Sequence, residues 1–433
     1  MKKRIVAMLC LMAMLLSMST LGMLAVSAGT VGDGDFVEAK PVENLDYSFA
    51  ILGDPQTVIE YEVKNQNKYK GFTNMFTWIT KNRESRKIEY LLCLGDTIDT
   101  LYTYPASYNP IYNNRVEWEK ARTNFKKLNG ILPYMVVRGN HDDEIGYHTY
   151  ICTTEYQNQI LKDANGNEVG GFYYDSSKTA TMGNSMSNCY RKLEVGNHKY
   201  LMLGLDFSIG DSKSGDDVIA WANGIIEANP DYKVIISVHA YLDSSGNRIR
   251  GDISQSNADR TETEAFFFSG NRLWDNLIKK HSNVFMVFSG HVSVDDPVVT
   301  KETGTNGNQI INILVDPQAT YEEGKLPLAM VLMMNVTNGG KKLEFEYIST
   351  DKNQQLSGSN RFTIDLPAGT LPEFTRTVAE ETTEATTVTE ASIDIVSEEV
   401  KKGCNGAILS TVTVCCAMGT SLAAFAMRKK KED

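Results

Sequence analysis

Residues 131–142 have the sequence Ile131-Leu-Pro-Tyr-Met-Val-Val-Arg-Gly-Asn-His-Asp142. The apolar first half predicts a buried β-strand, and Gly139 predicts a sharp turn where that strand ends. Asn140, His141 and Asp142 would then lie at the carboxyl end of the strand, which is where open α/β sheets bind their ligands. The stretch also fits a polar turn capped by an asparagine. Its meaning therefore depends on whether similar strand ends occur elsewhere in the chain.

Four other apolar runs end in polar side chains of the same kinds. The strands predicted at residues 47–52, 88–94, 232–238 and 284–289 are followed, in that order, by Asp54 with Gln56, by Asp96, by His239 and by His291. One histidine after a strand is most often structural, but carboxylate, amide and imidazole groups at five strand ends form a mixture that divalent cations bind. An aspartate can bridge two ions about 3.5–4 Å apart. The pattern therefore predicts a dinuclear site in which a bridging hydroxide attacks a phosphate ester.

Hydrophobic periodicity predicts the remaining elements. Helices are expected at residues 69–83, 116–128, 217–228 and 272–280, and further strands at 172–174, 199–205, 309–315, 329–336, 341–348 and 362–366. The strands at 329–336 and 341–348 flank Thr337-Asn-Gly-Gly340, which is a hairpin pattern. Between Asp143 and Lys192 the periodicity weakens, and this excursion is our candidate for shaping substrate specificity.

Taken in order, the polar strand ends form a recognisable series. The series is Gly-Asp-x-Gln, Gly-Asp-x-x-Asp, Gly-Asn-His-Asp, a lone histidine after a strand, and Gly-His. It resembles the calcineurin-like metallophosphoesterase family from about Tyr47 to Asp295, and the strands that follow fit the family's second sheet. The resemblance implies an α/β fold, a four-layer α/β/β/α sandwich, with two divalent metal ions between the strand ends. It also implies a metal-dependent phosphoric ester hydrolase.

The same resemblance assigns roles to the candidate residues. The expected ligands are Asp54 and Gln56 for the first ion, Asn140, His239 and His291 for the second ion, and Asp96 as the bridge between them. His141 is expected to be a proton donor or charge stabiliser for the leaving oxygen rather than a ligand. Asp99 and Asp142 either orient the ligands from the surrounding shell or cap the helices that follow them.

The sequence departs from the family pattern at both positions that would give the first ion an imidazole. Gln56 stands where many members have histidine, and the usual Gly-His-x-His is here Gly290-His-Val-Ser293. Serine is a poor ligand, so the first ion would be held mainly by oxygen, in a harder and weaker site that favours Mn, Mg, Ca or Fe over Zn. Asp295 or Asp296 could approach instead, and an enzyme with a single tightly bound ion is an open alternative.

A second Asp-Pro-Gln occurs later in the chain, within Val315-Asp316-Pro317-Gln318. It repeats the wording of Asp54-Pro55-Gln56 only, and we expect the repetition to be a coincidence. No role is assigned to it from the sequence.

Both ends of the chain carry membrane-targeting patterns. Lys2-Lys-Arg4, an apolar run and the small residues Val26-Ser-Ala28 predict a secretory signal peptide. Residues 407–427 are mostly apolar and precede Arg428-Lys-Lys-Lys431; a helix of this length spans roughly 31 Å, the thickness of a bilayer core. The basic cluster would stay in the cytoplasm and the body of the protein outside. An unrelated surface helix is the alternative.

The expected organisation therefore has five parts. They are a signal peptide (1–28), a calcineurin-like phosphoesterase domain (45–366), a Thr- and Glu-rich disordered stalk (367–402), a single transmembrane anchor (407–427) and a basic cytoplasmic tail (428–433). The formal net charge of −11 argues against nucleic acid as a partner. Cys152 and Cys189 either pair in an oxidising compartment or stay free.

We therefore expect an exported, bacterial, membrane-anchored enzyme whose extracellular domain hydrolyses small-molecule phosphate mono- or diesters. The alternative is a non-catalytic cell-surface binding or adhesion protein on a degenerate phosphoesterase scaffold, which the missing second histidine and the stalk favour. The substrate, the identity of the metals (Mn, Fe, Mg, Ca or Zn) and the oligomeric state are left open by the sequence.

Overall fold

The computed structural model describes residues 36–65, 68–99, 114–174, 186–207, 213–249, 270–320, 329–356 and 361–376. The chain divides into two compact units, Met1–Val378 and Ala379–Asp433, and all of the described residues belong to the first. The predicted signal peptide, transmembrane anchor, cytoplasmic tail and most of the stalk lie outside the described residues. Within the described ranges, no helix has the length and apolar composition needed to cross a membrane.

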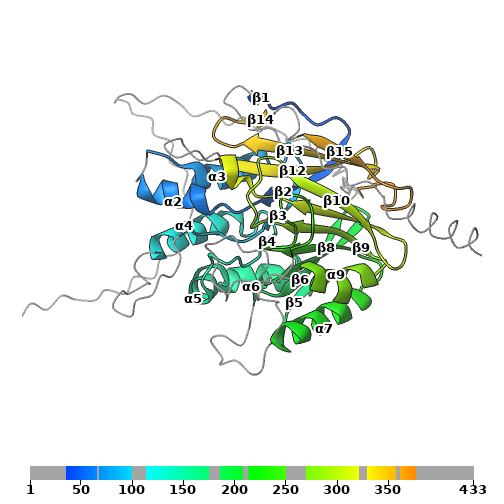
Figure 1. Ribbon diagram of the computed structural model, residues 1–433. Coiled ribbons are helices and arrows are strands. Elements are labelled where there is room, and N and C mark those ends of the chain that lie inside the picture. The colour runs from blue at the N-terminus through cyan, green and yellow to red at the C-terminus, as the bar shows by residue number, and fades with distance from the viewer. Residues whose placement is uncertain are drawn as a thin grey trace, which may run out of the picture. The chain divides into compact units, whose positions relative to one another are not determined.

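Two β-sheets form the centre of the described structure (Figure 1). The first sheet has the order β1 (Phe36–Glu38), β14 (Gln354–Leu356), β13 (Lys342–Ser349), β12 (Met330–Thr337), β2 (Leu45–Leu52), β3 (Ile88–Cys93) and β4 (Tyr134–Val136), with β15 (Phe362–Asp365) paired to β13. The second has the order β10 (Val298–Thr303), β11 (Gln309–Leu314), β9 (Val284–Ser289), β8 (Lys233–Val238), β7 (His198–Leu205), β6 (Cys189–Val195) and β5 (Gly170–Phe172). The predicted mixed α/β fold is thereby confirmed.

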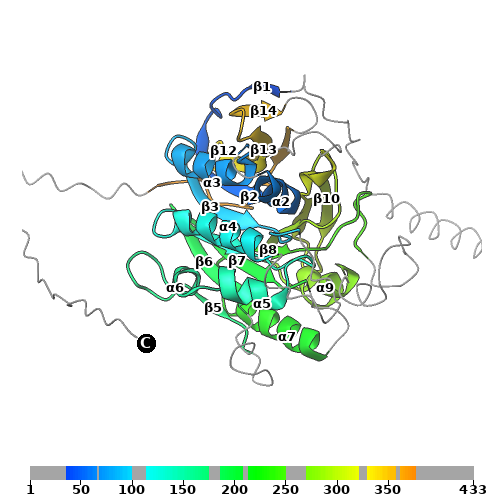
Figure 2. The same ribbon diagram turned by 90° about the vertical axis from the view of Figure 1, so that its left-hand side faces the viewer.

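Helices pack on both sheets (Figures 1 and 2). The core of the first sheet includes residues of α2 (Gln56–Lys64), α3 (Gly71–Asn82) and α4 (Arg115–Phe125) with its extension η2 (Lys126–Leu128), and the core of the second includes residues of α7 (Lys213–Glu227), α9 (Gly270–Asn276) and η5 (Ile278–Lys280). After β4 come α5 (Glu144–Gly146), the π-helical turn η3 (Tyr147–Ile151) and α6 (Thr154–Leu161), and after β11 comes η6 (Pro317–Thr320). The helices predicted at 69–83, 116–128, 217–228 and 272–280 therefore all exist, with shifted ends.

Alternation along each strand explains how the second sheet buries both of its faces. In β8, Ile235 packs in the core that contains Phe49 of β2, whereas Val234 and Ile236 pack in the core that contains Ala222 of α7. Successive side chains of a strand point to opposite faces, so β8 separates a core between the sheets from a core beneath the helices. Such double coverage is typical of parallel strands and explains their nearly continuous apolar sequences.

Parallel pairing brings the predicted site residues to one edge of each sheet. Strands β2, β3 and β4 run parallel in the first sheet, and β7, β8, β9 and β11 run parallel in the second. The polar residues that follow these strands therefore leave the two sheets at their carboxyl edges. This topology is the condition for a shared site between the sheets.

The hairpin after the last histidine belongs to the first sheet. The strands at 329–336 and 341–348 are β12 and β13, and β12 pairs antiparallel with β2, for example through Met334 and Phe49. The strands after Asp295 were expected to fit a single sheet, the second sheet of the family, and this is wrong for β12 and β13. It holds for β10 and β11, because β11 pairs with β9 and β10 pairs with β11. The apolar pattern of a strand does not specify which sheet it joins, so the tertiary fold decides this pairing.

Strand β6 is missing from the prediction because an arginine occupies one of its buried positions. Cys189, Arg191, Leu193 and Val195 alternate with more exposed residues, as a half-buried strand requires. The Arg191 guanidinium donates a 2.9 Å hydrogen bond to the carbonyl oxygen of Lys162, and it thereby satisfies a group beyond the end of α6.

The sequence left open whether Cys152 and Cys189 form a disulfide. In the structure both are buried free thiols.

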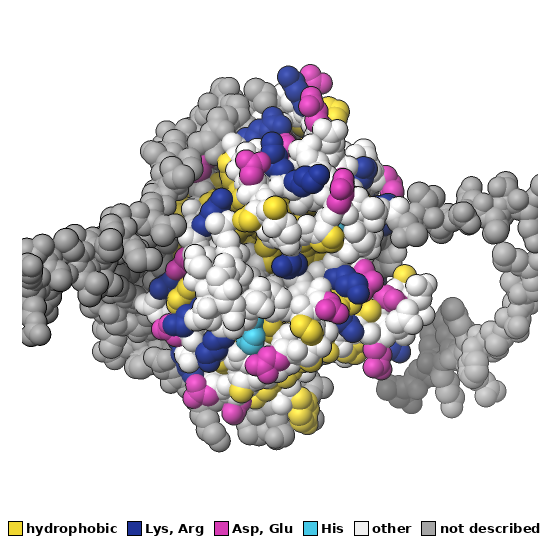
Figure 3. Space-filling view, turned by 90° about the vertical axis from the view of Figure 1, so that its right-hand side faces the viewer, with side chains coloured by type: hydrophobic (Ala, Val, Ile, Leu, Met, Phe, Trp, Pro, Cys, Tyr) yellow, Lys and Arg dark blue, Asp and Glu magenta, His cyan; other side chains and the backbone are white. Residues whose placement is uncertain are grey.

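The surface drawn in Figure 3 has mixed charge. Lys and Arg side chains are interspersed with Asp and Glu across the described part of this face, and apolar side chains form patches between them. Apolar atoms contribute much of any folded protein's surface. The described part of this face therefore has the mixed polarity of an ordinary protein surface.

The aromatic packing between the sheets gives a test of this fold. The Phe49 ring is fully buried, and its centroid lies 5.4 Å from that of Tyr200 in the second sheet. Phe49→Ala should lower the free energy of unfolding by about 3–5 kcal/mol, because the cavity cannot close between two rigid sheets. The control Val116→Ala, at a side chain that is 49% exposed, should change it by less than about 0.5 kcal/mol. Equal effects in urea unfolding of the two variants would contradict this packing.

Candidate metal centre

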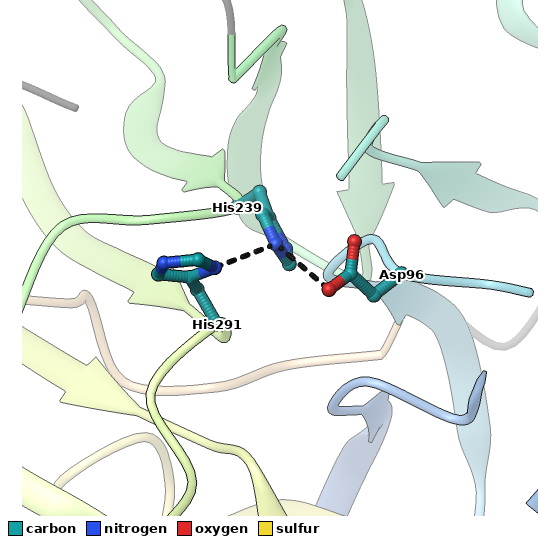
Figure 4. A group of neighbouring side chains, drawn as sticks. All are labelled: Asp96, His239 and His291. Atoms are coloured by element: carbon teal, nitrogen blue, oxygen red, sulfur yellow. Dashed lines mark hydrogen bonds and ion pairs between the residues drawn. The ribbon is translucent and has the colours of Figure 1, made fainter. Parts of the chain in front are cut away.

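Four of the predicted ligands come together between the two sheets. His239 Nε2 and His291 Nδ1 each lie 2.9 Å from Asn140 Oδ1, and His239 Nε2 lies 3.3 Å from Asp96 Oδ2. One ligand atom from each of Asp96, His239 and His291 fits within 4.8 Å of the others, and Figure 4 shows the three side chains turned toward one another. Asp96 and Asn140 follow β3 and β4 of the first sheet, and the histidines follow β8 and β9 of the second.

The hydrogen bonds of His239 decide which of its nitrogens faces the cluster. Its Nδ1 lies 2.9 Å from the carbonyl oxygen of Leu94. A carbonyl can only accept, so Nδ1 carries hydrogen and Nε2 is the nitrogen available as a metal ligand. The fully buried ring thus presents the correct atom to Asn140 and Asp96. Orientation of a ligating histidine by a backbone carbonyl is a common feature of metal sites.

Asp54 and Gln56, the residues expected at the first ion, lie beside this cluster. Asp54 Oδ2 accepts a 2.7 Å hydrogen bond from the backbone N–H of His291, while Asp54 Oδ1 lies 3.9 Å from His239 Nδ1 and has no hydrogen-bond partner. The Gln56 amide nitrogen donates to Gln318 Oε1 at 3.0 Å, and Gln56 Oε1 is also buried without a partner. Two buried oxygens are therefore left unsatisfied on the Asp54 side of the cluster.

The remaining predicted residues support the cluster from its edge. The half-buried His141 donates its backbone N–H to Asp96 Oδ1 at 2.8 Å, and its Nδ1 lies 2.9 Å from the carbonyl oxygen of Asp99. The carboxylate of Asp99 lies 3.9 Å from the same nitrogen. Asp142 instead accepts hydrogen bonds from the backbone N–H groups of Thr97 at 2.8 Å and Gly139 at 3.0 Å. It thereby ties the loop after β3 to the loop after β4.

Asp142 does not cap the helix that follows it. The capping residue of α5 is Asp143, whose side chain accepts from the backbone N–H of Gly146. Of the two roles that the sequence leaves open for Asp142, the structure favours support of the loops that carry the ligands. Burial, followed by the negative charge of Asp96, raises the pKa of Asp142 to about 7.

Backbone strain is concentrated at the cluster. Asp54, Asp96 and His291 have φ angles of 34°, 44° and 74°, which lie in the left-handed region. Residues with a Cβ adopt this region at a cost of roughly 1–2 kcal/mol each, and they persist there only when the surrounding structure holds them. Strain at three candidate ligands suggests that their placement serves function.

Gly139 is required for close approach rather than for a left-handed turn. Its φ angle is not positive, unlike that of Gly95. A Cβ at position 139 would lie 2.2 Å from Asp96 Oδ1, which is far inside van der Waals contact. Glycine is therefore required at position 139 because the Asp96 carboxylate occupies the space that any side chain would need.

Burial and neighbouring charges together set the pKa values of the cluster. Burial opposes ionisation of Asp96, but the neighbouring His239 and His141 outweigh it and lower its pKa. Burial likewise opposes protonation of His239, but Asp96 reverses the effect and raises the pKa of the imidazole. Burial, together with the charges of Asp316 and Asp96, raises the pKa of Asp54 well above its usual range. A cation at this place would relieve the repulsion between the carboxylates.

The residues present fit divalent metal ions. Carboxylate oxygens, amide oxygens and imidazole nitrogens are the donors that Mn²⁺, Fe²⁺ and similar ions accept. The unpartnered Asp54 Oδ1 and Gln56 Oε1 are buried polar atoms that need a partner, and coordination to a cation would provide one. The group Asp96, His239 and His291 is close enough to hold an ion.

Two residues at the site were not predicted. Gln318 Nε2 lies 3.2 Å from Asp316 Oδ2 and 3.4 Å from Asp54 Oδ2. Asp316 is fully buried, and burial, followed by the charge of Asp96, raises its pKa to about 6. The second Asp-Pro-Gln, to which the sequence assigned no role, therefore lies in contact with the first. The repetition itself was the available signal, but only the packing of β11 beside β2 gives it meaning.

The sequence of residues 47–295 matches the model of the calcineurin-like phosphoesterase family. Because the match covers more than half of the chain, the protein belongs to this family. The chain is also similar to the uncharacterised protein YvnB of Bacillus subtilis (strain 168), with 25% identity over 256 residues, which make up 59% of this chain and 16% of the relative. The chain thus spans about a sixth of the length of that relative.

Solved structures with similar chains include two proteins of low sequence identity. GAP50, the anchor in the inner membrane complex of Plasmodium, has a TM-score of 0.37 and 10% identity, with 76% of this chain and 90% of that chain covered. TT1561 of Thermus thermophilus has a TM-score of 0.31 and 12% identity, with 73% of this chain and 99% of that chain covered. At such scores neither similarity carries an inference about function.

The raised pKa of Asp54 predicts how metal-free stability depends on pH. Asp54 keeps its proton in the fold at pH values where the unfolded chain, with a carboxyl pKa of about 4, has lost it. The folded state then binds more protons, so the free energy of unfolding should fall as the pH rises above about 4, the carboxyl pKa of the unfolded chain. Saturating Mn²⁺ should reduce this fall, because the ion stabilises the ionised carboxylate.

Urea unfolding of the full-length chain across this pH range, with EDTA or with Mn²⁺, measures both slopes. Asp54→Asn should flatten the metal-free slope, because the variant has no proton to lose at that position. The matched control Asp365→Asn, at an exposed carboxylate of β15, should leave the slope unchanged. A metal-free slope that is identical in all three proteins would contradict the raised pKa of Asp54.

Proposed function

We propose that this protein is a secreted, membrane-tethered, metal-dependent phosphoesterase that hydrolyses small-molecule phosphate mono- or diesters. The single observation that supports the proposal most is the convergence of Asp96, Asn140, His239 and His291 within hydrogen-bonding distances, from strands of both sheets. Membership of the calcineurin-like phosphoesterase family agrees with this chemistry.

The proposed site holds two divalent ions, with Asp54 and Gln56 at the first, Asn140, His239 and His291 at the second, and Asp96 between them. When bound, the ions would acidify a water molecule and neutralise the phosphate oxygens. The protein itself contributes the fixed orientation of the ligands. Asp142 holds the two loops that carry Asp96 and Asn140, and the Leu94 carbonyl fixes the ring of His239.

His141 is placed to transfer a proton at one specific atom. Its Nδ1 donates to the carbonyl oxygen of Asp99, so Nε2 is the nitrogen left to face a substrate. The side chain is 22% exposed, which allows contact with a bound phosphate ester at the rim. Protonation at Nε2, followed by donation to the leaving oxygen, would prevent the build-up of negative charge on that oxygen.

The location outside the cell is proposed from the ends of the sequence. Residues 1–28 would direct export, residues 407–427 would anchor the chain in the membrane, and residues 428–433 would remain in the cytoplasm. The catalytic domain, 45–366, would then act on extracellular phosphoesters at the end of the stalk, 367–402. The basic residues after the apolar segment support this orientation.

A non-catalytic binding protein is the second candidate function. The observation in its favour is that Ser293, which stands at the position of the family's second histidine, is exposed and leaves the first ion without an imidazole. The two functions differ in metal content. A full-length chain that binds none of Mn²⁺, Fe²⁺, Zn²⁺ and Ca²⁺ and hydrolyses no phosphoester would favour the second.

Replacement of the bridging carboxylate tests the catalytic site. Asp96→Asn should lower Mn²⁺-dependent hydrolysis of p-nitrophenyl phosphate or bis-p-nitrophenyl phosphate by at least about 100-fold, since it removes charge that holds both ions. EDTA should abolish wild-type turnover, and added Mn²⁺ should restore it. Asp365→Asn serves as the matched control and should keep the wild-type rate. Undiminished turnover in Asp96→Asn would reject this site.

Replacement of His141 separates proton donation from metal binding. His141→Ala should lower kcat by about 100- to 10,000-fold, with unchanged Mn²⁺ content by elemental analysis. The loss should be larger for a phenyl ester than for a nitrophenyl ester, because phenolate is the poorer leaving group and depends more on a proton. Loss of metal together with activity, or equal losses on both esters, would argue against the proton-donor role.

A further inference from the structure

The proposed site of the first ion has no histidine ligand, whereas the proposed site of the second ion has two. Asp54, Gln56 and Asp96 contribute two carboxylates and one amide, and Ser293 is exposed. Asp54 Oδ1 and Gln56 Oε1 are nevertheless more than nine-tenths buried, and both are without a hydrogen-bond partner. Buried polar atoms of this kind require a partner, because the loss of hydration is otherwise uncompensated.

The end of β11 lies directly against the end of β2. A Cβ on Gly53 would lie 2.0 Å from the carbonyl oxygen of Val315, so the two backbones touch at this point. Val315 itself donates its N–H to the carbonyl oxygen of Ser289 at 2.8 Å, which keeps β11 in register with β9. The residue that follows each of these two contact positions is an aspartate, Asp54 after Gly53 and Asp316 after Val315. The two Asp-Pro-Gln motifs therefore meet across the contact between the sheets.

Hydrogen bonds at Gln318 of the second motif connect it to both Gln56 and Asp54 of the first. Gln56 Nε2 donates to Gln318 Oε1 at 3.0 Å, and Gln318 Nε2 lies 3.4 Å from Asp54 Oδ2. Gln318 also holds its own aspartate, because its backbone N–H lies 3.1 Å from Asp316 Oδ1 and its amide nitrogen lies 3.2 Å from Asp316 Oδ2. Gln318 thus positions both carboxylates at once and leaves Gln56 Oε1 free of a protein donor.

We propose that Asp316 is the missing ligand of the first ion, in the place that a histidine would fill, and that Gln318 orients Asp54 and Asp316 toward that ion. The first ion is then held by Asp54, Gln56, Asp96 and Asp316, which offer oxygen atoms only. Such a site suits a hard cation such as Mn²⁺ or Mg²⁺, whereas the second ion keeps two imidazoles. This inference rests on the proposed function, since it assumes that the centre binds metal.

Binding of Mn²⁺ to the full-length chain tests the inference without any measurement of turnover. The wild type should bind two ions. Asp316→Asn, which keeps the shape of the side chain but removes its charge, should weaken one of the two binding events by at least about 10-fold and leave the other unchanged. Asp365→Asn is the matched control for loss of a carboxylate, and Asp295→Asn tests the half-buried acidic neighbour of Ser293; neither should alter the isotherm.

Each contrary outcome has a distinct meaning. Two unchanged binding events in Asp316→Asn, or a loss in Asp295→Asn instead, would overturn the assignment of Asp316 but leave the proposed function standing. A single event in the wild type would overturn both the assignment and the two-ion form of the proposed site, but would leave metal-dependent hydrolysis standing. A wild-type chain that binds no Mn²⁺ would overturn the proposed function as well. Should Asp316→Asn fail to fold, anomalous diffraction from Mn²⁺ in wild-type crystals decides: an Asp316 oxygen about 2.2 Å from an ion supports the assignment, and a distance well beyond that rejects it.

Discussion

The hydrogen bond between His239 and the carbonyl oxygen of Leu94 joins the two sheets at the candidate metal centre. It runs from the end of β8 in the second sheet to the end of β3 in the first, over 2.9 Å and in a fully buried setting. One contact thereby does two things: it fixes the distance between two strand ends, and it selects Nε2 of His239 as the free nitrogen. The convergence of Asp96, Asn140 and His291 on that nitrogen depends on this contact.

The centre concentrates features that a folded chain normally avoids. Left-handed backbone at Asp54, Asp96 and His291, unpartnered buried oxygens at Asp54 and Gln56, and carboxyl groups of Asp54 and Asp142 whose pKa is raised by burial and by the charge of Asp96 all occur among the residues of the candidate metal centre. The large apolar core between the sheets stabilises the fold enough to hold them. A bound cation would offset the repulsion, so metal binding at this centre would also stabilise the fold.

The two halves of the site differ in chemistry because they draw on different strand ends. The ends of β4, β8 and β9 contribute an amide and two imidazoles, while the ends of β2 and β11 contribute Asp54 and Asp316, each followed by Pro and Gln. Asp96 at the end of β3 lies 3.3 Å from His239 Nε2, and its charge also contributes to the raised pKa of Asp54. The contact between Gly53 and Val315 brings β2 and β11 together, so the loss of imidazole ligands is matched by a gain of carboxylate. In the proposed site, oxygen ligands in place of nitrogen would shift the preference of the first half toward harder cations.

Local sequence determined the parallel strands, the helices with strong periodicity and the candidate residues at each strand end, because apolar runs and the polar turns after them are features of neighbouring residues. It did not determine β6, where the buried Arg191 interrupts the alternation, or the return of β12 to β2. It also could not separate the cap and support roles of Asp142. Above all, only tertiary structure gave meaning to Asp316 and Gln318: the bonds from Gln318 to Gln56 and Asp54 join residues 262 and 264 positions apart, and the stacking of two sheets that creates them leaves no trace in local periodicity.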